Sequence, residues 1–296
     1  MTTFAQISAT LQSTKGNAKT AVYERPISID DKGSDANTSR SHARGPFRNA
    51  APSTANLNAR LAAEELSLAA YIQSELMSIR LPSVSYALLT GKTVPCSAIG
   101  GDFFDAVALT DAICAVVADV SGKGIPAAIV AAMLQGIIHA GMLASQPLTT
   151  IATTVNEFLC SRTTGKFATM VLLKIWENGA LEYLNCGHVP PLLVNNASAR
   201  QLEGGNVVVG LIPAAEYTSE ARNLMPGDRI IIFTDGITEA ENTQGEQFGD
   251  SALEAGPFSL DSVFERLIKF QGSVERSDDC TLFELRYQGF GSILQR

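Results

Sequence analysis

The stretch that decides the fold is GGDFFD at residues 100–105, followed after a short spacer by AVVADVSGKG at residues 115–124. Residues 112–118 form an apolar run that predicts a buried strand, and Asp119 follows it directly. A buried strand that delivers a carboxylate to a glycine-rich loop can hold a hard cation, because the strand fixes the ligand while glycines admit backbone carbonyls and water. Asp102 has glycine neighbours as well. The stretch predicts either a cation site or, if each Asp stands alone, strands that end in solvated carboxylates.

The same arrangement recurs twice towards the carboxyl end of the chain. Residues 229–234 are an apolar run that finishes at Asp235, next to a glycine. Asp278 and Asp279 form an acidic pair just before the last strand-like run, residues 282–287. Three occurrences of an acidic residue next to an apolar, strand-like run favour a single shared site over three unrelated exposed carboxylates.

Four acidic motifs follow one another along the chain: GGDFFD, DVSGKG, TDGITEA and DDCT, at residues 100–105, 119–124, 234–240 and 278–281. In this order they resemble the SpoIIE/RsbU branch of the metal-dependent PPM phosphatases, relatives of protein phosphatase 2C. The resemblance extends from about Glu64 to Tyr287, and it includes NCGHVPP at residues 185–191 and GEQFG at residues 245–249. Each motif alone is a weak indication, but four in the family's order are specific.

The residue pattern by itself predicts an α+β protein, because antiparallel hairpins are interrupted by helices in two places. The strand-like runs are residues 83–89, 103–109, 112–118, 167–176, 180–184, 192–194, 216–224, 229–234 and 282–287, and the predicted helices are residues 125–142, 148–160 and 260–270. Asn178-Gly179 predicts a tight hairpin turn. The resemblance implies more: an αββα sandwich of two antiparallel sheets flanked by helices.

Three segments are expected along the chain. Residues 1–52 are rich in Ser, Thr, Ala and Asn without a sustained apolar period, which predicts a disordered tail. Residues 53–80 predict a linker helix, and residues 81–290 the PPM-type phosphatase domain. The apolar side of the helix at residues 56–78 predicts either packing on its own domain or a homodimer. The family places a linker helix here, and this resemblance together with the run Leu61, Leu68, Ile72 and Ile79 favours the homodimer.

Composition excludes several classes of protein. A net charge of −8 argues against a nucleic-acid groove, which needs a clustered basic face. The apolar stretch at residues 125–144 is interrupted by polar residues, so we expect a buried helix and no membrane span. The five scattered cysteines predict reduced thiols and, with no secretory leader visible, a cytoplasmic protein. The three histidines lie far apart in sequence, so any metal would have oxygen ligands.

The resemblance implies the ligands of such a metal centre. They are the carboxylates of Asp102, Asp119, Asp235 and Asp278 and the backbone carbonyl of Val120. Asp102 and Asp119 would carry catalysis, with Asp119 bridging two divalent cations, and oxygen ligands favour Mn²⁺ or Mg²⁺. Asp279 is the alternative to Asp278, because the two are adjacent. Asp105 and Glu239 are either groups that support these ligands or ordinary exposed carboxylates.

Phosphate monoesters are inert in water, so their hydrolysis needs positioned positive charge and an activated water. Two metal ions about 3.5 to 4 Å apart can supply both. The resemblance therefore implies a protein-serine/threonine phosphatase, with a phosphorylated anti-sigma-factor antagonist as its substrate. Two alternatives stay open: a catalytically inactive pseudophosphatase that binds a phosphoprotein, and a hydrolase of small phosphoesters.

Three further features bear on the site. The lysine of Gly122-Lys123-Gly124 does not belong to a nucleotide-binding P-loop, because Gly124 follows it and Val117 stands where the first glycine is required. His188 is either a structural hydrogen-bonding residue or a general acid. The phosphatase 2C branch has a phosphate-binding arginine upstream of its first acidic ligand, and residues 95–99 contain none, which leaves the phosphate contact unassigned.

Overall fold

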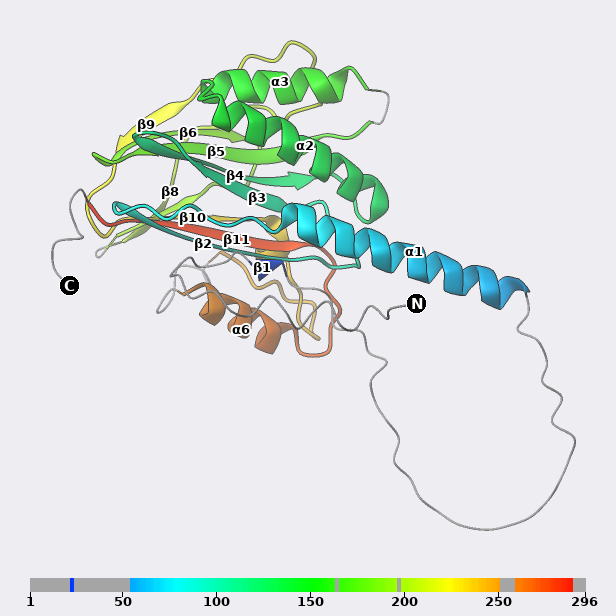
Figure 1. Ribbon diagram of the computed structural model, residues 1–296. Helices are drawn as coiled ribbons and strands as arrows, with labels where there is room; N and C mark the ends of the chain where they lie inside the picture. Colours follow the sequence, from blue (N-terminus) through cyan, green and yellow to red (C-terminus); the bar gives the residue numbers. More distant parts are fainter. Residues whose placement is uncertain (1–21, 24–53, 163–164, 196–197, 251–258, 290–296) are drawn as a thin grey trace, which may run out of the picture.

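The computed structural model describes residues 22–23, 54–162, 165–195, 198–250 and 259–289. Two β-sheets stack face to face, and helices cover the outer side of each sheet (Figure 1). This arrangement confirms the αββα sandwich.

One sheet has five antiparallel strands in the order β3-β4-β5-β6-β9. The strands are β3 Phe103–Ala108, β4 Ala112–Val120, β5 Ala168–Trp176, β6 Ala180–Cys186 and β9 Glu220–Asn223. Its outer side is covered by α2, Ile125–Leu143, and α3, Leu148–Cys160 (Figure 1). The predicted turn at Asn178-Gly179 joins β5 to β6, with Gly179 in the left-handed region at φ 88°.

The other sheet has six strands in the order β1-β2-β11-β10-β7-β8. The strands are β1 Val22–Tyr23, β2 Ala87–Val94, β7 Leu192–Val194, β8 Ala199–Gln201, β10 Arg229–Phe233 and β11 Cys280–Tyr287. All neighbours are antiparallel except the short β1, which pairs parallel to β2. Helix α6, Leu260–Gln271, covers the outer side, and Ser259 caps its first turn by reciprocal bonds with Ser262.

Buried side chains form three apolar layers, one between the sheets and one under the helices on each side. Because strand side chains alternate between faces, consecutive residues enter different layers. On β3, Phe103 packs under α2 while Phe104 packs between the sheets. On β10, Ile232 lies between the sheets and Phe233 faces α6. This alternation fixes which acidic residues can meet in the gap between the sheets.

Most predicted elements are present, but the first strand is displaced. Residues 83–89 were expected to be extended, whereas β2 begins at Ala87 and continues to Val94. The reason is pairing with a distant strand: Ala87 to Val94 pair residue by residue with Tyr287 to Cys280 of β11. A Cβ on Gly91 would lie 2.5 Å from the Phe104 ring, so glycine at this position lets β2 cross that ring. Similarly, of residues 216–224 only β9 is a strand. Strand β4 extends beyond its predicted end, so Asp119 lies within it.

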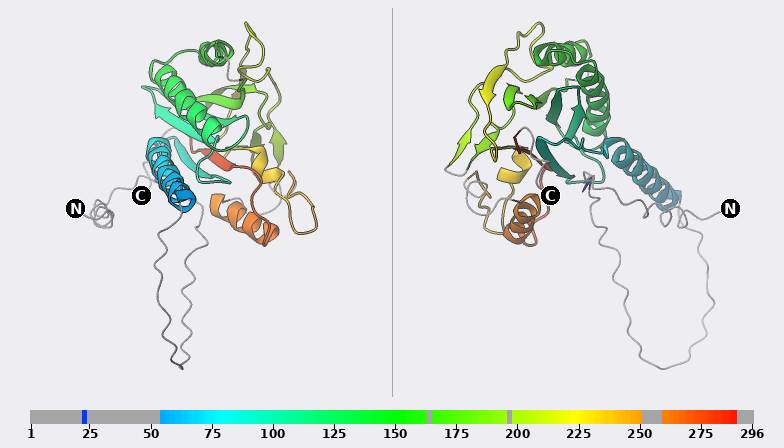
Figure 2. Two further views of the ribbon diagram at one scale, coloured as in Figure 1. Left: turned by 90° about the vertical axis from the view of Figure 1, so that its right-hand side faces the viewer. Right: turned by 60° about the vertical axis from the view of Figure 1, so that its left-hand side comes forward.

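Helix α1, Thr54–Met77, projects from one end of the sandwich (Figures 1 and 2). Its last turns are held by the domain, because Gln73, Ser74 and Met77 are buried. The expected apolar side is largely exposed: Leu61, Leu68, Ile72 and Leu76 are 49 to 61% exposed. The helix therefore does not bury that side on its own domain. The disordered tail predicted for residues 1–52 lies outside the described residues except for β1, and the division into segments stays a prediction.

One helix in the described part of the chain, α2, is long and apolar enough to cross a membrane, judged by length and composition alone. Of its most apolar window, 44% is buried inside the protein. Ala131, Leu134 and Ile138 are fully buried in the layer under the five-stranded sheet. The helix thus packs as the core helix expected for residues 125–144.

Candidate metal centre

The acidic motifs come together at one edge of the sandwich. Asp102 directly precedes β3 and Asp119 lies near the end of β4, and β3 pairs antiparallel with β4. In the other sheet Asp235 follows β10 and begins the short helix α4, Asp235–Thr238, while Asp278 and Asp279 precede β11, which pairs with β10. Phe104 and Val117 face the gap between the sheets, and Asp102 and Asp119 are each two residues away from them. Since alternate residues of a strand share a face, Asp102 and Asp119 also face this gap. The four strand ends therefore bring their carboxylates to a common region. We call this region the acidic cluster; it consists of Asp102, Asp119, Asp235, Asp278 and Asp279.

Asp102 is the most buried of these acids, at 1% exposure. Its Oδ2 accepts a hydrogen bond of 2.7 Å from Oγ1 of Thr234, which follows β10 in the opposite sheet. The Thr234 hydroxyl also accepts from the N–H of Thr281 at 2.9 Å. Burial raises the pKa of Asp102 well above its ordinary value, and Asp119 and Asp279 raise it further, partly offset by the Thr234 bond. Thr234 thus joins the two sheets directly at the acidic cluster.

The carboxylates repel one another. Burial, together with the charges of Asp235, Asp278 and Asp279, raises the pKa of Asp119 to about 7. The pKa of Asp235 is also raised, first by burial and then by the nearby charges of Glu239 and Asp278. Like charges held together in a partly buried site favour their protonated forms unless a cation neutralises them. The donor set is made of hard oxygens, so it fits Mg²⁺ or Mn²⁺.

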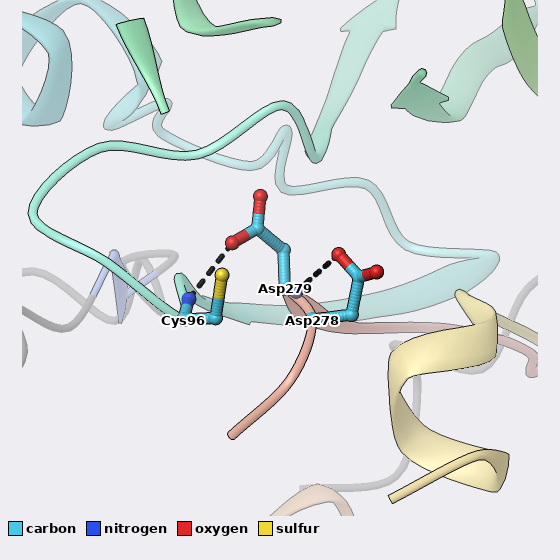
Figure 3. A group of neighbouring side chains, drawn as sticks. All are labelled: Cys96, Asp278 and Asp279. Atoms are coloured by element: carbon cyan, nitrogen blue, oxygen red, sulfur yellow. Dashed lines mark hydrogen bonds between the residues drawn. The ribbon is translucent and has the colours of Figure 1, made fainter. Parts of the chain in front are cut away.

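The two adjacent acids before β11 have different surroundings (Figure 3). Asp279 is buried, and its two oxygens accept hydrogen bonds from the N–H groups of Cys96 at 2.8 Å and Gly101 at 2.7 Å. Asp278 is half-exposed; its Oδ2 lies 3.2 Å from Nζ of Lys123, and its Oδ1 accepts from the N–H of Asp279. One ligand atom from each of Cys96, Asp278 and Asp279 lies within 4.8 Å of the others. The carboxylate of Asp279 therefore holds the backbone of residues 96–101 in place, while the carboxylate of Asp278 stays accessible.

Close approach of backbone explains the glycines in the acidic motifs. A Cβ on Gly100 would lie 2.5 Å from Oδ2 of Asp279, and a Cβ on Gly236 would lie 2.0 Å from the carbonyl oxygen of Asp279. A Cβ on Gly101 would lie 2.8 Å from the carbonyl oxygen of Val120. The segments that carry the acids therefore pack too tightly for any side chain at these positions.

Asp105 and Glu239 occupy different places. Asp105 faces away from the gap between the sheets: its Oδ2 lies 2.7 Å from Nδ1 of His139 on α2. Burial raises its pKa, and the contact with His139 opposes this. Glu239 is exposed at the end of α4, close enough for its charge to raise the pKa of Asp235. The structure thus brings Glu239, but not Asp105, to the side of the acidic cluster.

Sequence reasoning missed the residues that hold the acidic loops. Thr234 and Thr281 lie inside the quoted motifs, but their hydroxyls gave no reason to expect a link between two sheets. Gln73 of α1 makes two bonds to the backbone of Gly100, donating from Nε2 at 2.8 Å and accepting at Oε1 at 3.1 Å. Nothing in the local sequence around Gln73 indicates this contact.

The two-sheet fold and the acidic cluster between its strand ends define a PPM-type phosphatase. The sequence profile of the family described as Stage II sporulation protein E (SpoIIE) matches residues 110–288. This match covers more than half of the chain, and the chain belongs to the SpoIIE family.

Individual relatives agree with this assignment. The chain is 26% identical over 259 residues to protein IcfG of Synechocystis sp., a match that covers 74% of the chain and 40% of IcfG. It is 26% identical over 241 residues to phosphoserine phosphatase RsbU of Bacillus subtilis, covering 75% of the chain and 70% of RsbU. The crystal structure of the RsbU and RsbW domains of Rv1364c from Mycobacterium tuberculosis superimposes with a TM-score of 0.61 at 28% identity. That match covers 71% of the chain and 62% of the other.

Proposed function

We propose that this protein is a metal-dependent protein-serine/threonine phosphatase. The observation that carries the proposal is the convergence of carboxylates from two sheets, where burial and then the charges of neighbouring carboxylates raise the pKa values of Asp102, Asp119 and Asp235. Such an arrangement is unfavourable without cations and is suited to binding them. A pseudophosphatase is less well supported, because all four carboxylates expected as ligands, Asp102, Asp119, Asp235 and Asp278, are present in the chain.

The proposed ligands are Asp102, Asp119, Asp235 and Asp278, with the carbonyl of Val120. Two divalent cations, Mn²⁺ or Mg²⁺, would supply positive charge for the phosphate and lower the pKa of a coordinated water. Asp119 would help to hold both cations, because the charges of Asp235 and of the pair Asp278 and Asp279 both act on its side chain. Asp279 would hold the loop of residues 96–102 in place through its backbone bonds.

The proposed substrate is a phosphorylated protein, and within that class an anti-sigma-factor antagonist. RsbU is named a phosphoserine phosphatase, and the Rv1364c structure contains RsbU and RsbW domains in one protein. All five cysteines are free in the structure, which suits the reducing cytoplasm that we propose as the location.

We further propose that residues 53–80 are a linker helix and residues 81–290 the phosphatase domain. In the linker, Leu61, Leu68, Ile72 and Leu76 expose apolar surface, as expected for a helix that pairs with a second copy. On the same helix, the side chain of Gln73 makes two hydrogen bonds to the backbone of Gly100, two residues before Asp102. A shift of the helix would therefore move the loop that carries Asp102.

Comparing two substrates tests the proposed function. A small folded phosphoserine protein should show a far higher kcat/KM than free phosphoserine, because binding energy away from the phosphate can position it. Both should be assayed with Mn²⁺ at the same enzyme concentration. Equal values of kcat/KM would favour a hydrolase of small phosphoesters, and no turnover of either would favour the pseudophosphatase.

A further inference from the structure

His188 is buried between the two sheets by the turn that follows β6. Gly187 has φ 64°, and a Cβ there would lie 2.4 Å from the Val208 side chain, so glycine is required at the turn. Asn185 then fixes the next residue twice: its Oδ1 accepts from the N–H of His188 at 2.8 Å, and its Nδ2 donates to the carbonyl of His188 at 3.0 Å. The turn therefore directs the ring inwards and holds it there.

One side of the ring touches the five-stranded sheet next to the acidic cluster. Nδ1 of His188 lies 2.7 Å from Oγ1 of Thr169 on β5. Thr169 is the direct cross-strand partner of Asp119. Directly opposite residues in an antiparallel pair have Cβ atoms about 5 Å apart on the same face. The hydroxyl that His188 holds is thus a neighbour of the Asp119 side chain.

The ring also lies close to the six-stranded sheet. The backbone of Phe233, the last residue of β10, is near enough to favour the protonated ring, although burial dominates and lowers the pKa of His188 to about 4. Nε2 is buried without a hydrogen bond of good geometry in the described part of the chain. Phe233 is two residues before Asp235. The neutral imidazole therefore lies between β5, where Thr169 pairs with Asp119 of β4, and the end of β10, which leads to Asp235.

The tautomer follows from these neighbours. If Nε2 carries the proton, Nδ1 is free to accept a hydrogen bond from the Thr169 hydroxyl. The other tautomer would bury an unprotonated Nε2 without any donor, which is costly. A buried, neutral ring whose Nδ1 is held by the Thr169 hydroxyl is unsuited to act as a general acid, so of the two roles considered for His188 the structure supports the hydrogen-bonding one.

We propose that His188 is a positioning residue for Asp119, acting through its bridge to the hydroxyl of Thr169, the cross-strand partner of Asp119 on β5. This inference rests on the proposed function, because it assigns the bridge between His188 and Thr169 a purpose in cation binding. Residues behind metal ligands typically change metal affinity by about 10-fold to 100-fold when altered. The bridge would act on affinity for the cation before it acts on any later step.

Two pairs of variants test the bridge through Mn²⁺ binding, measured by calorimetry without substrate. Thr169→Val removes the hydroxyl and Thr169→Ser keeps it; His188→Phe removes both nitrogens, and His188→Asn keeps an acceptor near the place of Nδ1. We expect Thr169→Val and His188→Phe to weaken Mn²⁺ binding about 10-fold or more, and the Ser and Asn variants to stay within about threefold. The double variant Thr169→Val/His188→Phe should bind Mn²⁺ no more weakly than the weaker-binding single variant, since both substitutions remove the same hydrogen bond between Thr169 and His188.

Asn156→Leu supplies the control for loss of stability alone. Asn156 is 1% exposed and bonds to the backbone of Gly210 and Ile212, away from the acidic residues. It should lower the melting temperature without changing Mn²⁺ affinity. If Thr169→Val and His188→Phe also lower the melting temperature but bind Mn²⁺ as the wild type does, the bridge has no positioning role and the inference is overturned. If the wild type itself binds no Mn²⁺, or Asp119→Asn binds it equally well, the proposed metal centre is wrong and the inference falls with it.

Discussion

Asp278 and Asp279 are adjacent, yet their replacement by Asn should have opposite consequences. Asp279 accepts backbone bonds on both carboxylate oxygens, from Cys96 and Gly101. An Asn at this position keeps one oxygen and turns its NH₂ group against the remaining N–H, so at least one charge-assisted bond is lost. Hydrogen bonds to charged groups contribute about 1.5 to 3 kcal/mol. We therefore expect Asp279→Asn to lower the free energy of unfolding of the metal-free protein by about 1.5 to 3 kcal/mol.

Asp278→Asn is the matched variant. Its carboxylate pairs with Lys123 at 3.2 Å, and both side chains are about half-exposed. Exposed pairs of this kind contribute about 0 to 1 kcal/mol, and an Asn Oδ1 can still accept from the N–H of residue 279. The free energy of unfolding should change by less than about 1 kcal/mol. Mn²⁺ affinity should fall sharply, because a ligand charge is lost.

Urea unfolding of both metal-free variants, followed by Mn²⁺ titration of the folded proteins, separates the two effects. The reasoning predicts a stability defect in Asp279→Asn and a binding defect in Asp278→Asn. The reverse pattern would refute it and would make Asp279 the ligand. Circular dichroism of each variant checks that the fold is retained before the titrations are compared.

Three other predictions follow from the same contacts. The pKa of Asp119 is about 7 in the folded protein and about 4 in an unfolded chain, so between these pH values the folded state binds one more proton. Without metal, the free energy of unfolding should therefore fall as pH rises from about 4 to 7. Urea titrations at several pH values measure this slope, and saturating Mn²⁺ should remove it. Gly236→Ala forces a Cβ within 2.0 Å of a backbone carbonyl and should cost about 1 to 3 kcal/mol in urea unfolding, whereas Gly136→Ala, in an open position on α2, should be neutral or stabilising. Leu68→Glu with Ile72→Glu should shift a homodimer towards monomer and alter the phosphatase rate; light scattering that finds a monomeric wild type at micromolar concentration would contradict this.

The acidic cluster could be predicted in outline because its information is local. Apolar runs that finish at Asp119 and Asp235 indicate strands ending on carboxylates, and strand ends are where a sheet can gather ligands. The helices after Gly124 and before the final strand could be predicted as well, because their apolar patterns are also local features of the sequence. Family resemblance then supplied the two-sheet sandwich, which antiparallel hairpins alone do not specify.

The parts that could not be predicted depend on contacts between distant segments. Asp279 bonds to Gly101, 178 residues away, and this pairing distinguishes it from Asp278 in a way that no local pattern reveals. Asp105 belongs to the same motif as Asp102, but the two have opposite alternation along β3, so Asp105 meets His139 on α2. Periodicity located the apolar side of helix α1 but left open whether its own domain or a second copy covers it. In the structure this side is exposed, because only the last turns of the helix reach the domain.

The most direct test of the central claim is hydrolysis of a phosphoserine protein by the wild type and Asp119→Asn, each with Mn²⁺ and with excess EDTA. If carboxylates from both sheets hold the cations that drive hydrolysis, the wild type should release phosphate with Mn²⁺ and lose this activity in EDTA. Asp119→Asn should be nearly inactive under both conditions while keeping a wild-type circular dichroism spectrum. Robust turnover by the wild type in EDTA, or by Asp119→Asn with Mn²⁺, would contradict the account.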